Sequence, residues 1–241
     1  MGVLVPATNA TAENEYHELA KDFPGLSVHV ARVPGEPGPL SRDWEVAFGR
    51  DCAQAAVQLQ SVHPDVIVVA NTSGTFINAE EEIAEQIEDA TGTATVTTAR
   101  AVVSCLKKLG ASRIGLVTPY PVEFNEYLTR YLGANEVVSV DVQTNTTADI
   151  STIGRYAPSE AYRLARRLRG DFEAIFISCT DFRTIEVLPL LEQDRGVPAI
   201  SSNLAGFTDA LGRVGIGLPK ERFQLWRQTT EVRGSAGVVG R

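Results

Sequence analysis

The chain lacks the features that mark several large classes of protein. No apolar run approaches the roughly 20 residues of a membrane-spanning helix, and the N-terminus has no basic region followed by an apolar core. The 241 residues carry a net charge of −8, whereas a surface that binds nucleic acid needs clustered lysine and arginine. We therefore expect neither a membrane nor a nucleic acid as a partner.

Cysteine is scarce: only Cys52, Cys105 and Cys179 occur. An odd number at wide spacing fits neither a disulfide framework nor a zinc motif, and such usage is typical of a reducing compartment. The sequence therefore predicts a cytoplasmic protein without a metal. No GxGxxG or GxxxxGK[ST] pattern is present either, so we expect no nucleotide cofactor.

What the chain does contain is a regular alternation of apolar strands and amphipathic helices. Strands are expected at residues 3–5, 27–31, 66–69, 95–97, 113–118, 137–142, 174–178 and 199–200. Helices are expected at residues 11–21, in a long stretch up to 62, and at 79–90, 99–109, 122–132, 158–169, 185–193 and 203–211. This alternation predicts an α/β fold in which parallel sheets carry helices on both faces.

The two halves of the chain repeat the same features. Each has a first strand that runs into a proline-containing loop, at Pro6 and at Pro119, and a later strand that ends in small polar residues. The repeat indicates two similar parallel-sheet domains related by pseudo-twofold symmetry, one formed by residues 1–96 and 204–241 and the other by residues 97–203. Ligands bind beyond the carboxyl ends of parallel strands, so we expect the active site in the cleft between the domains.

Two polar clusters at strand ends carry the chemistry that the sequence offers. They read Asn71-Thr72-Ser73 in the first half and Ser178-Cys179-Thr180 in the second. Hydroxyls and free backbone N–H groups at such positions suit a carboxylate or a developing oxyanion. Helix capping is the commoner role for any single serine or threonine, but two clusters in matching positions favour a binding site.

Cys179 is the candidate for catalysis. It follows a buried strand and precedes an expected helix, and the N-terminus of a helix can depress the pKa of a thiol. Such a thiol can act as a nucleophile or as a proton donor; the alternative is an inert small residue in a tight turn. Cys52 and Cys105 fall within helical patterns and are expected to be buried and inert. No histidine lies in the matching loops, so a Cys–His pair is not evident.

Several short motifs follow one another along residues 1–215. They occupy residues 2–9 with Glu13 beyond them, and residues 97–101, 109–120, 177–180 and 198–203. Together they resemble the aspartate/glutamate racemase superfamily, specifically its maleate isomerase and arylmalonate decarboxylase branch. The resemblance implies a cofactor-independent enzyme that acts on a small carboxylate or dicarboxylate.

The resemblance also assigns roles to individual residues. Racemases and maleate isomerases use two cysteines; the second matches Cys179, whereas Asn71 occupies the position of the first. An amide carries no proton near neutral pH, which argues against two-thiol racemisation. Arylmalonate decarboxylases keep only the second cysteine, as proton donor, and their Thr-Ser pair and tyrosine match Thr72, Ser73 and Tyr120. They depart from this chain in having glycine at the position of Asn71.

We therefore expect Cys179 to be the catalytic residue of a decarboxylase that protonates its product stereoselectively. The expected substrate-binding residues are Asn9, Asn71, Thr72, Ser73, Tyr120 and Thr180. Two alternatives stay open. The first is an isomerase that is similar to the maleate cis–trans isomerases but has altered chemistry, and Asn9 in the N-terminal loop favours this alternative. The second is a carboxylate-binding protein without catalysis. Apolar helix faces, such as that of residues 46–59, would allow a homo-oligomer.

Overall fold

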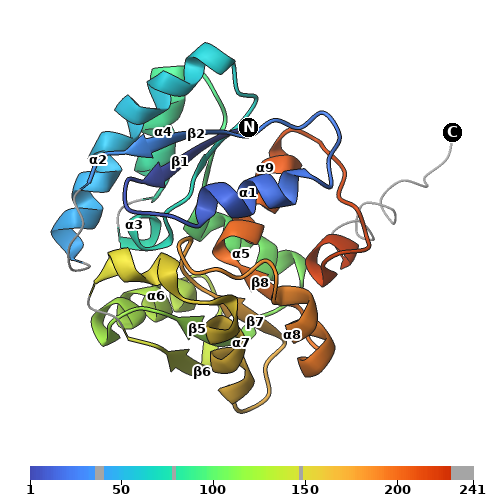
Figure 1. The fold of residues 1–241 in the computed structure, drawn as a ribbon. Coiled ribbons are helices and arrows are strands. Elements are labelled where there is room, and N and C mark those ends of the chain that lie inside the picture. Colours follow the sequence, from blue (N-terminus) through green and yellow to red (C-terminus); the bar gives the residue numbers. More distant parts are fainter. Residues whose placement is uncertain (36–40, 78–79, 147–148, 229–241) are drawn as a thin grey trace, which may run out of the picture.

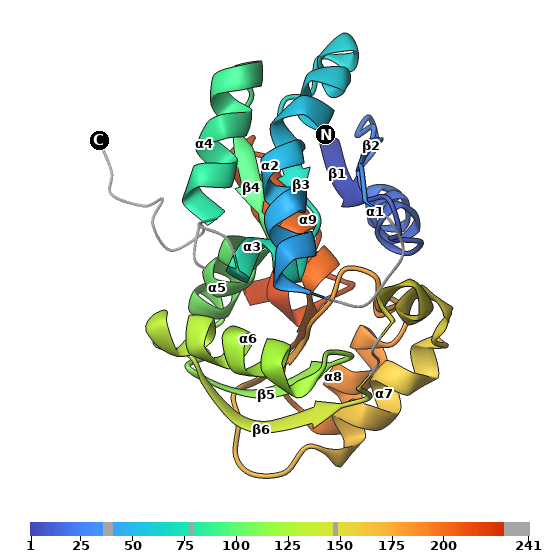
Figure 2. The same cartoon turned by 90° about the vertical axis from the view of Figure 1, so that its left-hand side faces the viewer.

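The computed structural model describes residues 1–35, 41–77, 80–146 and 149–228, and two four-stranded parallel sheets form its centre (Figure 1). The first sheet contains β1 (Gly2–Pro6), β2 (His29–Val33), β3 (Ile67–Val69) and β4 (Thr95–Thr97), in the order β2-β1-β3-β4. The second contains β5 (Arg113–Thr118), β6 (Val138–Thr144), β7 (Ala174–Ile177) and β8 (Ala199–Ser201), in the order β6-β5-β7-β8. The shared strand order confirms the prediction of two similar parallel-sheet domains, which Figure 2 shows one above the other.

Helices surround the two sheets. The first half contributes α1 (Ala12–Ala20), α2 (Arg42–Leu59), α3 (Thr72–Ile77), α4 (Glu80–Thr91) and α5 (Thr98–Lys108). The second contributes α6 (Val122–Ala134), α7 (Pro158–Arg167), α8 (Leu188–Arg195) and α9 (Ser202–Arg213), and the 3-10 turns are η1 (Gln60–Val62) and η2 (Ile150–Arg155). No helix in the described ranges is both long enough and apolar enough to cross a membrane.

The core follows from the two-residue period of the strands. Val3 and Val5 of β1 pack into the cluster that contains residues of α1 and α9, whereas Leu4 between them packs with residues of α2 and α4. Each face of the first sheet is thus covered by its own pair of helices, which is why the strands read as continuous apolar runs.

All eight expected strands are present, and the structure differs from the expectation mainly at three short segments. Helix α3 and the turn η2 were not expected, and the helix expected from residue 185 begins at Leu188. Helix α9 packs against α5, which the prediction places in the second domain, and also against α1, β3 and β4 of the first. The domain boundaries at 96/97 and 203/204 stay a prediction, and residues 229–241 lie outside the described residues.

A glycine allows α9 to approach α1. A Cβ atom at Gly206 would lie 2.4 Å from the hydroxyl oxygen of Tyr16 in α1, which is far inside van der Waals contact. Gly212, one and a half turns further along the same helix, has no heavy atom within 4 Å of its Cβ position. Two glycines in one helix therefore have different physical roles.

We expect Gly206→Ala to lower the free energy of unfolding by about 1–3 kcal/mol, because the added methyl group overpacks the contact with Tyr16. Gly212→Ala is the matched control and should raise it by about 0.4–1 kcal/mol, since alanine restricts the unfolded chain more than glycine does. Urea unfolding of the three proteins measures both effects, and equal stabilities for the two variants would contradict the proposed contact.

Candidate active site

The carboxyl ends of β3 and β7 open into one cavity between the two sheets, with a volume of about 40 Å³. Six of the seven expected site residues line it, namely Asn9, Asn71, Ser73, Tyr120, Cys179 and Thr180. Residues that sequence reasoning missed also line it, among them Trp44, Glu45 and Asp181. The volume of the cavity is far below the roughly 300–1,000 Å³ of a typical ligand pocket, so part of the lining must move for a substrate to bind.

Thr72 does not line the cavity but joins the two polar clusters. The Thr72 hydroxyl donates a hydrogen bond to the Ser202 Oγ atom at 2.8 Å. Ser202 Oγ in turn accepts the backbone N–H of Cys179 at 3.1 Å. Ser202 opens α9 and is not among the expected site residues. The hydroxyl of Thr72 is thus engaged in placing the Cys179 backbone.

Cys179 lies in a turn, and its backbone is held in an unusual conformation. Its φ angle is +94°, a region that residues other than glycine rarely adopt and that costs of order 1–3 kcal/mol. The next helix, α8, begins only at Leu188. The prediction that Cys179 stands at the start of a helix is therefore wrong.

The electrostatics of the thiol differ from the expectation as well. Burial raises the pKa of Cys179 to about 12, and hydrogen bonds from the backbone N–H groups of Asp181 and Phe182 and from the Tyr120 hydroxyl counter this shift only in part. The prediction of a depressed thiol pKa was wrong because desolvation outweighs the local donors. At neutral pH Cys179 is a protonated thiol, and the same donors would stabilise the thiolate that remains after it gives up its proton.

Tyr120 places a neutral hydroxyl beside this thiol. The side chain is buried, and desolvation followed by the nearby Cys179 raises the pKa of Tyr120 well above its ordinary value. The Ser178 hydroxyl approaches the Tyr120 oxygen at 3.4 Å. Tyr120 therefore remains a hydrogen-bond donor at every pH at which the protein is expected to work.

Asn71 and Ser73 bind a carboxyl group of the protein itself. The Nδ2 atom of Asn71 donates to Glu45 Oε2 at 2.8 Å, and the Ser73 hydroxyl donates to Glu45 Oε1. Glu45 comes from the first turn of α2, which Ser41 caps, and the side chain is 0% exposed. Burial raises the pKa of Glu45 to about 7, although both hydrogen bonds act to lower it. A Cβ atom at Gly74 would lie 2.8 Å from Glu45 Oε2, so glycine there makes room for the pair.

Asn9 ties the N-terminal loop to the second polar cluster. Its Oδ1 atom accepts the backbone N–H groups of Thr11 and Ala12 at 3.0 and 2.8 Å, which caps the start of α1. Its Nδ2 atom donates to Thr180 Oγ1 at 3.0 Å, and that hydroxyl donates to the carbonyl oxygen of Ala70 at 3.0 Å. Asn9 and Thr180 therefore fix the loop across the interface and still border the cavity.

Asp181 fastens the segment of Cys179 to the first domain. Its carboxylate accepts the backbone N–H groups of Ala10 and Thr11 at 2.8 and 3.0 Å and that of Gly154 at 3.1 Å. Desolvation nevertheless raises the pKa of Asp181 to about 6. This carboxylate also lines the cavity.

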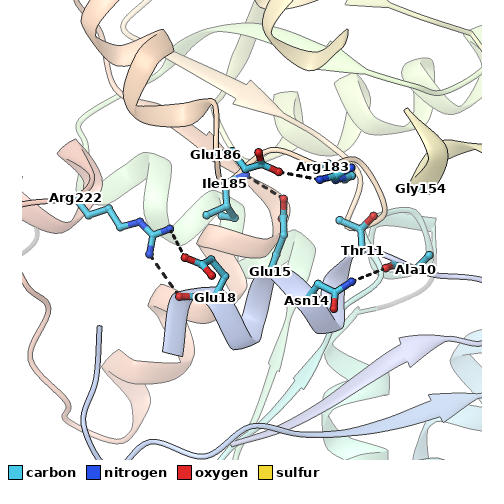
Figure 3. A pocket seen from close by; sticks show the side chains of 10 residues that line it. All are labelled: Ala10, Thr11, Asn14, Glu15, Glu18, Gly154, Arg183, Ile185, Glu186 and Arg222. Carbon is cyan, nitrogen blue, oxygen red and sulfur yellow. Dashed lines mark hydrogen bonds and ion pairs between the residues drawn. The ribbon is translucent and has the colours of Figure 1, made fainter. Parts of the chain in front are cut away.

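Glu15 makes the reciprocal contact from α1. Its carboxylate accepts the backbone N–H groups of Thr184 and Ile185 at 2.5 and 3.0 Å and the Nδ2 group of Asn203 at 2.7 Å. Burial raises the pKa of Glu15. Figure 3 shows Glu15 pointing from α1 towards Ile185.

A larger hollow of about 730 Å³ lies on the outer side of these contacts (Figure 3). Its two cations are already paired: Arg183 with Glu186 at 3.0 Å, and Arg222 with Asp22 at 2.8 Å. Over the described ranges, no group of three or more His, Cys, Asp or Glu side chains is arranged to hold a metal ion. The chemistry of the site therefore rests on the smaller cavity and its thiol and carboxyl groups.

Comparison with known proteins fits this geometry. A family model described as arylmalonate decarboxylase matches residues 46–222. The arylmalonate decarboxylase of Bordetella bronchiseptica is 29% identical over 225 residues, which cover 90% of this chain and 91% of that protein. The maleate isomerase of Nocardia farcinica is 27% identical over 218 residues, 86% of either chain. The solved structure of the Nocardia farcinica maleate cis–trans isomerase bound to TRIS has a TM-score of 0.86 at 23% identity and covers 95% of this chain and 98% of its own.

The chain belongs to the arylmalonate decarboxylase family. The relatives and the solved neighbours are enzymes, and the predicted branch of maleate isomerases and arylmalonate decarboxylases is confirmed. The two-sheet fold is shared with the isomerase structure.

Cys179 should be the only one of the three cysteines that iodoacetamide labels in the folded protein. It borders the cavity, whereas Cys52 and Cys105 are 0% exposed inside the core. Because the thiolate is the reacting form, labelling should be slow at pH 7 and should rise about tenfold per pH unit up to pH 9. Mass spectrometry of tryptic peptides measures the rate. Labelling that levels off below pH 8 would show a thiol with a low pKa instead.

Glu45 should make stability depend on pH in an unusual direction. Its pKa is raised from 4.5 to about 7 on folding, so in this range the folded protein keeps a proton that the unfolded chain releases. Stability then falls as pH rises. Relative to the native protein, Glu45→Gln should therefore gain about 3 kcal/mol in free energy of unfolding between pH 4 and pH 8. Guanidinium unfolding at several pH values tests this, and a difference that stays constant with pH would refute it.

Proposed function

We propose that the protein is a cofactor-independent decarboxylase of a small malonate-type dicarboxylate, with Cys179 as the donor of a proton to the product. Membership of the family and its relatives support the broader class of a cofactor-independent isomerase or decarboxylase. The observation that carries the finer assignment is the state of Cys179: a buried, protonated thiol that borders the cavity, with an amide at Asn71 in place of a second thiol.

The proposed reaction needs one bond to break before the thiol acts. Loss of carbon dioxide leaves the electron pair of the C–C bond on the α-carbon, where the remaining carboxylate spreads it as an enediolate. Neutral donors at the cavity wall, the Tyr120 hydroxyl foremost, stabilise the negative charge on oxygen. The S–H bond of Cys179 then breaks and a C–H bond forms at the α-carbon. The thiolate is held by the N–H groups of Asp181 and Phe182 until it regains a proton from water.

An isomerase of the maleate type is the second candidate, and the position of Asn9 favours it. Its amide lies in the cavity wall next to Thr180, as expected for the N-terminal loop of those enzymes. In those enzymes, however, the resemblance implies that the first cysteine adds to the double bond, and Asn71, whose amide cannot do so, stands at its position. Addition by Cys179 instead would require its thiolate, and burial raises the pKa of Cys179 to about 12. Decarboxylation with protonation uses the thiol in the form that this environment favours.

Incubation with phenylmalonate, maleate and a set of small amino acids, followed by NMR of the products, tests the proposal. Phenylmalonate should be decarboxylated, and Cys179→Ser should lower the rate about 10²–10⁴-fold, the usual contribution of a positioned acid. The activity should survive a chelator and dialysis.

Cys105→Ser is the matched control. This thiol is buried and contacts the carbonyl of Ala205 away from the cavity, so its loss should leave the rate unchanged. Conversion of maleate to fumarate without decarboxylation would favour the isomerase instead. Binding of these compounds without any turnover would point to a carboxylate-binding protein.

A further inference from the structure

Two carboxyl groups border the cavity besides the Cys179 thiol, and their surroundings differ. The oxygens of Asp181 accept three backbone N–H groups of the surrounding loops, which gives this residue a structural role. Glu45 is held by side chains instead, the Asn71 amide and the Ser73 hydroxyl, and both of these also border the cavity. Glu45 is therefore the acid that the substrate would meet.

We propose that Glu45 is the second proton-transferring group of this site and acts from the first domain, on the face of the substrate opposite Cys179. The inference rests on the proposed function only in placing the substrate in this cavity between the two polar clusters. It extends that function, because an enzyme with two proton carriers can act on a carbon atom from either side.

The repeated fold supports the placement. Strands β3 and β7 hold the same position in their two sheets, and Asn71 and Cys179 follow their carboxyl ends. A thiol at residue 71 would supply protons from the first domain. In its place the Asn71 amide, at 2.8 Å, holds the Glu45 carboxyl at that end of the cavity, and Gly74 leaves the space that this arrangement needs. Asn71 is thus a positioning residue, and the proton carrier comes from α2.

The charges around Glu45 suit a group that both takes and gives a proton. Among the described residues that line the cavity there is no lysine or arginine. The titratable groups that sense Glu45 are Tyr120 across the cavity and Cys52 on its own helix, and both have raised pKa values. The pKa of Glu45 is about 7 and that of Cys179 about 12. Environments that separate the pKa values of neighbouring groups in this way mark an acid and a base.

The proposed step balances for a carboxylate that has a hydrogen on its α-carbon. The Glu45 carboxylate takes the α-proton: the C–H bond breaks, an O–H bond forms, and the electron pair passes into an enediolate. The Cys179 thiol then protonates the opposite face, leaving a thiolate and a protonated Glu45. Proton exchange with water then returns Cys179 to the thiol and Glu45 to the carboxylate. The substrate class is thus a 2-substituted carboxylate, and after decarboxylation of a prochiral malonate each group would deliver its proton to a different face.

The handedness of one product tests the inference. The probe is 2-methyl-2-phenylmalonate, whose product 2-phenylpropanoate is resolved by chiral chromatography. Glu45→Gln, which keeps the size of the side chain but carries no proton, should raise the excess of one enantiomer. Cys179→Ser should leave a reaction at least 10-fold slower that yields the other enantiomer. Identical enantiomeric excess in the native protein and in Glu45→Gln, with no product of opposite hand from Cys179→Ser, would overturn the assignment.

A second measurement needs no turnover. In protein labelled with ¹³C at glutamate carboxyl groups, the resonance that Glu45→Gln removes should titrate near pH 7, and a midpoint below pH 6 would overturn the inference. Loss of the Asn71 donor in Asn71→Ala should move this midpoint upward. If the resonance titrates near pH 7 but the probe is not decarboxylated, the proposed decarboxylase fails while Glu45 stands as a poised acid.

Glu192→Gln is the control for removing a buried carboxyl. Glu192 is also buried and accepts the backbone N–H groups of Ala199 and Gln224, but it lies outside the cavity. Its substitution should change neither the enantiomeric excess nor the titration of Glu45. A change of handedness in Glu192→Gln equal to that in Glu45→Gln would assign the effect to general loosening of the fold and overturn the inference.

Discussion

The site depends on two buried carboxylates, one from each domain, which accept hydrogen bonds from the other domain. Asp181, two residues after Cys179, accepts N–H groups of the N-terminal loop, while Glu15 of α1 accepts N–H groups at Thr184 and Ile185. Each carboxylate loses water on burial and regains hydrogen bonds mainly from the opposite domain, so removing either partner leaves an uncompensated polar group. Both contacts lie on the C-terminal side of Cys179, while its own N–H donates to Ser202 Oγ. Together these hydrogen bonds hold the turn in which Cys179 has a φ angle of +94°.

Most of the fold was predictable because parallel strands that are buried on both faces appear in the sequence as continuous apolar runs. The runs at 66–69 and 174–177 are wholly apolar and contain β3 and β7. The short helix Thr72–Ile77 gave no such signal, since its six residues are buried throughout their first five positions and show no amphipathic period. Its helical form comes from its position after a buried strand and not from propensity.

The site was predictable in its residues and only partly in its chemistry. Cys179 and Asn71 were found from strand ends, which the chain order reveals. Glu45 was not found, because an acid in the first turn of a helix is typical of a residue that faces solvent and interacts favourably with the helix dipole. Only the packing of α2 against α3, which carries Ser73, shows that Glu45 is buried. The pKa of Cys179 was misjudged for the same reason, since burial is a property of the assembled domains.

The small size of the cavity has a kinetic consequence. A space of about 40 Å³ is smaller than an aromatic or dicarboxylic acid, so side chains at the interface between the two halves must shift for such a molecule to bind. The carboxylate contacts of Asp181 and Glu15 span that interface, and the motion that opens it belongs to the class that limits turnover in many enzymes. If that motion is the slow step, the rate of turnover will fall as solvent viscosity rises, whatever the strength of the bonds that the reaction breaks.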